Sequence, residues 1–192
     1  ATDLDGSPST AEGAFSETNL MFIRRDPFID FNWHCGGPTC NSNTVEEYDC
    51  TPFDHDYQIR WRGTYYAPIA GNYKFQTRTD DGVKLWVDGD KLVDDWTTHN
   101  TKENIGSIHL NAGDVVDVRL DYFENSGDAD VELNVKIPGS NDYVKAAPAG
   151  YGPEGGAEPI YSGVMMNIYL YAGTNSGGEP GQYCDYSNIK IQ

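Results

Sequence analysis

Apolar and polar residues alternate along several segments of this chain, and this pattern constrains its fold more than any other feature. The alternation runs through residues 57–65, 73–78, 83–87, 116–122 and 131–137. A period of two places successive side chains on opposite faces of an extended strand. Tight turn signals such as Asp88-Gly89 separate the segments, and helical spacing is nearly absent. The sequence therefore predicts an all-β fold, a β-sandwich or barrel of antiparallel strands.

The chain of 192 residues has room for one substantial core rather than two. Residues 1–14 are small and acidic, and we expect them to form a flexible leader. We expect residues 15–192 to form a single β domain, with its core over 20–140 and a C-terminal extension over 146–192. Two strands predicted in the extension cannot bury a core alone, so we expect them to complete the main sheet: residues 164–171 and 188–191.

Four cysteines are present, and their spacing matches no zinc site: Cys35, Cys40, Cys50 and Cys184. If all four pair, three connectivities are open, and each joins Cys184 to one of the other three. Such disulfides would pin a long loop over residues 32–56 to the C-terminal tail. Disulfides form in oxidising compartments, so we expect an extracellular or cell-surface location. The alternative is four reduced, buried thiols.

The charge balance restricts the partners of the chain. Its 13 basic and 30 acidic residues give a net charge of -17. A field of this sign disfavours nucleic acid and anionic membrane surfaces. No apolar run approaches the length of a spanning helix, so we expect no membrane insertion. The composition suits an exported protein or one that binds cations.

Two adjacent aspartates, Asp80 and Asp81, stand between a predicted strand and Gly82. Neighbouring carboxylates repel each other unless a cation lies between them. In an extended strand their side chains would point to opposite faces, whereas a cis peptide between them would bring both to one side. Calcium prefers oxygen ligands of this kind. The alternative interpretation is a solvated Asp-Asp-Gly turn.

The run from Tyr57 to Ile137 resembles the PA14 family, named after the fourteen-kilodalton segment of anthrax protective antigen. The resemblance rests on many ordered matches, among them Ile59-Arg60-Trp61-Arg62-Gly63, Thr79-Asp80-Asp81-Gly82-Val83-Lys84-Leu85-Trp86 and Leu120-Asp121-Tyr122-Phe123-Glu124-Asn125. It covers about two thirds of the chain. The loop that holds three of the cysteines and the tail beyond residue 145 fall outside it. The resemblance implies a β-sandwich or barrel, the fold of domains found in adhesins, glycosidases and toxins.

In the sugar-binding members of this family, an Asp-Asp pair joined by a cis peptide binds calcium. A second loop adds oxygen ligands, and sugar hydroxyls complete the coordination. By resemblance, the calcium ligands of this chain are the carboxylates of Asp80 and Asp81, the side chain of Asn125, and the backbone carbonyls of Gly127 and Ala129. These donors leave positions open for a vicinal diol.

The resemblance also predicts carbohydrate contacts around the calcium, from Asp80, Asp81, Asn125, Ser126, Asp128, His99 and Arg78. We therefore expect a calcium-dependent lectin or adhesin domain of the sugar-binding adhesin branch. Its partners would be mono- or oligosaccharides on cell surfaces or a polysaccharide, and the domain would belong to a larger multidomain protein. The alternative is a calcium-stabilised spacer module of a large surface protein that binds no sugar.

We do not expect an enzyme, and we assign no catalytic residue. Paired carboxylates can hydrolyse glycosides, but the abundant acids near Asp88 and Asp94 belong to a predicted hairpin, where solvated charge is usual. The sequence contains neither a Gly-x-Ser-x-Gly nucleophile motif nor a phosphate-binding loop.

Overall fold

The structure is a computed structural model that describes residues 15, 20–34, 37–38, 56–146 and 166–172. Its strands, in chain order, are β1 (Leu20–Asp26), β2 (Asp30–His34), β3 (Tyr57–Tyr66), β4 (Gly71–Asp80), β5 (Val83–Val87), β6 (Asp90–Asp95), β7 (Lys102–Leu110), β8 (Val115–Glu124), β9 (Ala129–Lys136), β10 (Val144–Lys145) and β11 (Met166–Ala172). Within these ranges there is no α-helix, and hence none that could cross a membrane. The expectation of an all-β fold is confirmed.

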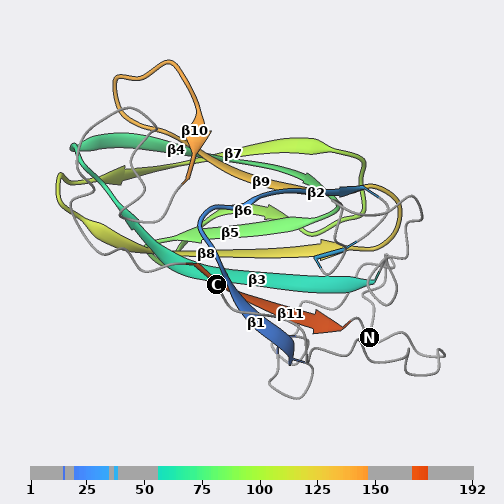
Figure 1. Cartoon of the computed structure of the whole chain (residues 1–192). Helices are drawn as coiled ribbons and strands as arrows, with labels where there is room; N and C mark the ends of the chain where they lie inside the picture. Colours follow the sequence, from blue (N-terminus) through green and yellow to red (C-terminus); the bar gives the residue numbers. More distant parts are fainter. Residues whose placement is uncertain (1–14, 16–19, 35–36, 39–55, 147–165, 173–192) are drawn as a thin grey trace.

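The strands form two antiparallel layers (Figure 1). One is a six-stranded sheet in the order β1-β11-β3-β8-β5-β6. The other is a five-stranded sheet in the order β10-β9-β4-β7, in which β2 also pairs with β9. Among the described strands, the two sheets stay separate and do not close into a barrel. The sandwich is therefore the architecture found, and the barrel is not.

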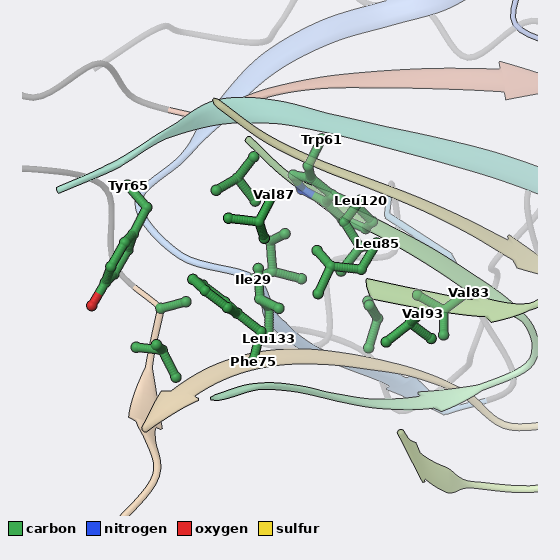
Figure 2. Packing of buried hydrophobic residues seen from close by; sticks show 14 of the residues in the cluster. Ile29, Trp61, Tyr65, Phe75, Val83, Leu85, Val87, Val93, Leu120 and Leu133 are labelled. Atoms are coloured by element: carbon green, nitrogen blue, oxygen red, sulfur yellow. The ribbon is translucent and has the colours of Figure 1, made fainter. Parts of the chain in front are cut away.

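The core lies between the two sheets and follows from the alternation in the sequence. Trp61, Leu85 and Leu120 point inward from the six-stranded sheet, and Phe75 and Leu133 point inward from the other. All five side chains are fully buried, and Figure 2 shows them packed together. Burial of apolar surface on this scale is the main term that stabilises the fold.

The five predicted alternating segments correspond to β3, β4, β5, β8 and β9. Strand β7 shows no such pattern, because Asn104 and Gly106 occupy positions that face the other sheet. Gly106 is needed there: a Cβ atom at this position would lie 2.5 Å from the Cβ of Leu92. The two sheets approach each other closely at Gly106, so this strand has a small residue where an apolar side chain would have indicated a strand.

The C-terminal extension contributes β11, which lies between β1 and β3 in the six-stranded sheet. This confirms that a strand of the extension adds to the main sheet. The predicted strand 188–191, the leader 1–14 and all four cysteines lie outside the described residues. The disulfides and the domain boundaries stay predictions.

The outward face of the six-stranded sheet carries a buried ion pair. Nε of Arg60 donates to Oδ1 of Asp121 at 2.7 Å, and a second guanidinium nitrogen donates to Oδ2 at 2.8 Å. Arg119 donates to the same carboxylate. Because Arg60 and Asp121 are both buried, each charge is stabilised by the other rather than by water.

Candidate metal centre

Strand β4 ends at Asp80, and the peptide bond between Asp80 and Asp81 is cis, as the sequence led us to expect. Gly82 follows the pair and passes directly over the ring of Phe123 on β8. A Cβ atom on Gly82 would lie 2.2 Å from that ring, so only glycine fits here. The backbone N–H of Phe123 donates to the carbonyl of Gly82 at 3.0 Å. These contacts fix the pair beside the end of β8.

A third carboxylate joins the pair. On β8, the inward positions pass from Leu120 through Tyr122 to Glu124, the last residue of the strand. Asp80, Asp81 and Glu124 each offer a carboxylate oxygen, and these oxygens lie within 4.8 Å of one another. We call this group the carboxylate cluster. All three residues are buried.

The carboxylate cluster is held by Tyr122. Its hydroxyl donates to the backbone carbonyl of Asp80 at 2.5 Å and lies 3.0 Å from Oε2 of Glu124. Oε1 of Glu124 is buried and has no hydrogen-bond partner. A buried oxygen without a hydrogen-bond partner is energetically costly. A bound cation would remove this cost by accepting Oε1 as a ligand.

The electrostatics of the carboxylate cluster favour a bound cation. Burial, and after it the charge of Asp81, raises the pKa of Glu124 to about 9. Burial and the same neighbouring charge raise the pKa of Asp80, and a hydrogen bond from the backbone of Thr101 acts against them. Without a metal, protonation relieves the repulsion. A divalent cation would relieve it by replacing the protons.

The carboxylate of Asp81 connects two loops. Oδ1 accepts the backbone N–H of His99 at 2.8 Å, in the loop of residues 96–101 between β6 and β7. Oδ2 accepts the backbone N–H of Asn125 at 2.9 Å, in the loop of residues 125–128 between β8 and β9. We call them the β6–β7 loop and the β8–β9 loop. They flank the carboxylate cluster from two sides.

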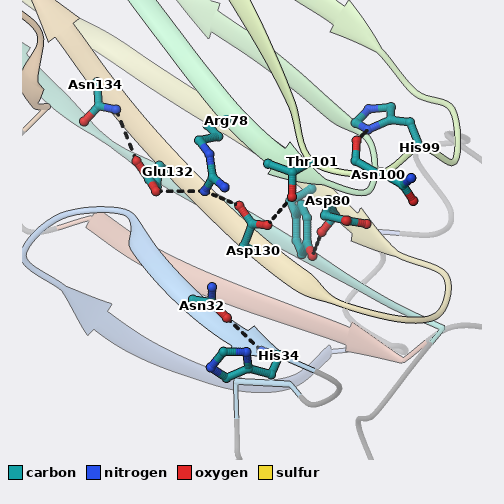
Figure 3. Close-up of polar contacts among 11 residues, drawn as sticks. Asn32, His34, Arg78, Asp80, His99, Asn100, Thr101, Asp130, Glu132 and Asn134 are labelled. Atoms are coloured by element: carbon teal, nitrogen blue, oxygen red, sulfur yellow. Dashed lines mark hydrogen bonds and ion pairs between the residues drawn. The ribbon is translucent and has the colours of Figure 1, made fainter.

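Asp130 stands directly across from Asp80 in the pairing of β4 with β9. It accepts a hydrogen bond from the hydroxyl of Thr101 at 2.8 Å and one from Arg78 at 2.7 Å. Arg78 also donates to Glu132 at 3.1 Å (Figure 3). One guanidinium nitrogen of Arg78 thus pairs with both acids of β9. The predicted contact of Arg78 with sugar stays a prediction.

The ring of His99, another predicted sugar contact, is turned toward the protein. Its Nδ1 lies 2.9 Å from the carbonyl oxygen of Asn100, and its Nε2 is buried 3.5 Å from Oδ2 of Asp95. The structure therefore brings His99 to the site through its backbone N–H. The neighbouring Asn100 is exposed.

The β8–β9 loop presents the remaining predicted residues. Ser126 and Asp128 are exposed, and Gly127 has a φ of 107°, a conformation that favours glycine. Ala129 is buried at the start of β9, where it pairs with His34. The roles of Gly127 and Ala129 as carbonyl ligands stay predictions.

Sequence reasoning missed Glu124, although the signal was present. The alternation that turns Leu120 and Tyr122 inward also turns Glu124 inward, because it stands two positions further along the same strand. An acid at an inward position, at the end of a strand, indicates a ligand or a buried partner.

The residues present fit a hard divalent cation. The cluster offers only carboxylate oxygens, without a cysteine or histidine ligand among them. Oxygen-only donors favour calcium or magnesium over zinc or copper. Oε1 of Glu124, which is buried and accepts no hydrogen bond, is available as a metal ligand. The protein is thus a two-sheet β-sandwich with a cluster of three buried carboxylates at one end, which could hold a divalent cation.

The chain belongs to the PA14 domain family, whose model matches residues 38–146. It is 34% identical over 116 residues to the anti-sigma-I factor RsgI3 of Acetivibrio thermocellus, a match that covers 60% of this chain and 16% of that protein. The solved anti-sigma factor domain-containing protein from Clostridium clariflavum shares 28% identity with a TM-score of 0.53, over 68% of this chain and 44% of that one.

The solved PA14 sugar-binding domain from an RTX adhesin has a TM-score of 0.52, over 76% of this chain and 89% of that one. Its identity to this chain is 18%, so the likeness demonstrates the fold alone. The relatives with 28% and 34% identity are described as anti-sigma factors, not adhesins. The chain spans about a sixth of the curated relative and less than half of the solved anti-sigma protein. Membership of the family is confirmed, while the adhesin context becomes a proposal.

Proposed function

We propose that this chain is an extracellular, calcium-dependent glycan-binding module without enzymatic activity. The observation that carries the proposal is the carboxylate cluster: three buried carboxylates within 4.8 Å, with Oε1 of Glu124 unpartnered. The charged neighbours that raise the pKa of Glu124 are Asp81 and Asp80, both acidic. Such a group needs protons or a cation for charge balance. Calcium suits its oxygen donors.

Asp80, Asp81 and Glu124 would hold the calcium, and Asn125 stands beside them with its backbone tied to Asp81. Bound calcium would supply open coordination positions that vicinal sugar hydroxyls can fill. The exposed Ser126 and Asp128, together with Asn100 across the site, offer hydrogen bonds that can distinguish one sugar from another. Tyr122 keeps the carboxylates in place.

The larger protein that would contain this module could be of two kinds. Identity of 34% to an anti-sigma factor favours a module of a regulatory protein, in which glycan binding outside the cell would be the input. Residues 1–192 would then be one part of a longer chain. A surface adhesin, the context expected from the sequence, would use the same site. Calcium and glycan binding do not depend on which context holds.

Calorimetry and a glycan array test the proposal. We expect the purified chain to bind calcium, and a set of glycans to bind in calcium but not in EDTA. Calcium at a hundred times its Kd should stabilise the fold by about 2.7 kcal/mol. Stabilisation by calcium without any glycan signal would favour the spacer module instead. If calcium neither binds nor stabilises, the proposed function is wrong.

A further inference from the structure

We propose that Asp95 is a positioning residue that sets the calcium affinity of the carboxylate cluster through the β6–β7 loop, without touching the metal. This inference rests on the proposed function for its readout in calcium. Asp95 is the last residue of β6 and Lys102 the first of β7, so the two stand at opposite ends of the loop.

The carboxylate of Asp95 joins both ends of the β6–β7 loop. Oδ1 accepts the hydroxyl of Thr97 at 3.0 Å, on the outgoing side. Oδ2 accepts Nζ of Lys102 at 2.6 Å and Nδ2 of Asn104 at 3.0 Å, on the returning side. The side chain of Asp95 is 13% exposed, and Nε2 of His99 lies 3.5 Å from it. One carboxylate thus closes the stem of the loop and faces the ring at its tip.

The same loop reaches the carboxylate cluster. His99 gives its backbone N–H to Asp81, and Thr101 gives a backbone hydrogen bond to Asp80. The hydroxyl of Thr101 is held by Asp130, the cross-strand partner of Asp80. Both aspartates of the cis pair are therefore oriented by donors from one loop. Residues that orient metal ligands by hydrogen bonds without contacting the metal typically lower metal affinity when they are removed.

The chain offers a matched control one residue away. Asp94 carries the same charge, but its side chain is 52% exposed. It pairs with Lys91 at 2.7 Å on its own strand and with Lys84 at 3.7 Å. It does not close a loop. Asp95→Asn and Asp94→Asn remove equal charge near the site, and Lys102→Met and Lys91→Met remove the matching lysines.

The experiment measures calcium affinity by calorimetry for these four variants and the unmodified chain. We expect Asp95→Asn to weaken calcium binding by about tenfold, the scale of residues behind metal ligands. Asp94→Asn should stay within about twofold, since exposed pairs contribute little. Equal weakening in both would mean that charge alone acts, and the inference would be overturned.

The lysine pair separates position from electrostatic field. Removing a positive charge near the site should tighten calcium binding if only the field matters. If Lys102 works by closing the loop with Asp95, Lys102→Met should instead weaken binding by about twofold to fivefold. Lys91→Met should change little. Tighter or unchanged binding in Lys102→Met would overturn the inference. Because Lys102 is half exposed, this variant keeps the test valid should Asp95→Asn fail to fold.

A second readout needs no calcium. In EDTA, amide hydrogen exchange at His99 and Thr101 should be faster by about tenfold or more in Asp95→Asn and only slightly changed in Asp94→Asn. Equal exchange in the two variants would contradict the inference. If the unmodified chain binds no calcium, the proposed function fails, and this exchange comparison still decides whether Asp95 orders the loop.

Discussion

Tyr122 and Glu124 stand two positions apart on β8, and the hydroxyl of Tyr122 lies 3.0 Å from Oε2 of Glu124. The same hydroxyl donates to the carbonyl of Asp80 at 2.5 Å. One tyrosine thus links the end of β4 to the end of β8. Oε1 of Glu124 accepts no hydrogen bond and is left available to a metal ion. This arrangement makes Glu124 the residue that best tests whether the carboxylate cluster binds a metal.

Glu124→Gln should lower calcium affinity by about tenfold or more, because it removes one of the charged donors. The amide keeps the shape of the side chain and can still meet the hydroxyl of Tyr122. The fold should therefore survive in EDTA. Calorimetry with calcium measures the loss. Glu103→Gln, an exposed acid on β7, is the control and should bind calcium normally. Normal affinity in Glu124→Gln would exclude Glu124 as a ligand.

The metal-free protein should lose stability as the pH rises. The pKa of Glu124 is about 9 in the folded chain, and it returns to about 4.5 on unfolding. Between these values the folded state binds the proton and the unfolded state does not, so the free energy of unfolding falls with increasing pH. Urea unfolding in EDTA from pH 5 to pH 9 measures this slope. It should be flatter in Glu124→Gln, and equal slopes would contradict the assignment.

Gly82→Ala should destabilise the protein by about 1–3 kcal/mol, because its new Cβ overlaps the ring of Phe123. The displacement reaches Asp81, so calcium affinity should fall as well. Thermal unfolding and calorimetry measure both effects. Phe123→Leu in the Gly82→Ala background frees space and should recover part of each loss. If the second change instead adds to the first, the steric explanation is wrong.

Asp121→Asn should lower the free energy of unfolding by about 3–5 kcal/mol, because it leaves the buried guanidinium of Arg60 without its ionised partner. Asp121 faces the outer side of the six-stranded sheet, away from the inward Tyr122. Calcium affinity of the folded fraction should therefore be unchanged. Asp117→Asn, exposed on the same strand, should stay within about 0.5 kcal/mol of the original stability. A loss of calcium affinity in Asp121→Asn would show coupling between the two faces.

Strands that bury one face against the other sheet could be predicted from the sequence. In β3, β8 and β9 most of the alternate residues are apolar because they enter the core, and this period is visible without any knowledge of neighbours. Strand β7 escaped prediction because Gly106 meets Leu92 at close range instead of contributing a large side chain. Packing between layers depends on the partner, which the local sequence does not contain.

The candidate site divides in the same way. Asp80 and Asp81 were identified by their adjacency and by the family resemblance, and their cis peptide is present. The orientation of His99 toward Asp95 and the pairing of Arg78 with Asp130 were not foreseen. The contact of Arg78 with Asp130 joins two strands far apart in the sequence, and the orientation of His99 depends on how the β6–β7 loop folds back on Asp95. The family resemblance drew attention to the acid pair, whereas the contacts around it depend on the fold.

The strand period, the tight turns and the adjacent acids can be read from the amino-acid sequence alone, because each of these is a local property of neighbouring residues. Glu124 joins the pair, and two loops meet at Asp81, only in the folded chain. Those relationships arise where β4 and β8, from opposite sheets, end at the same edge of the sandwich. Repulsion among buried carboxylates exists only after folding has brought them together, and a cation becomes the natural partner at that point.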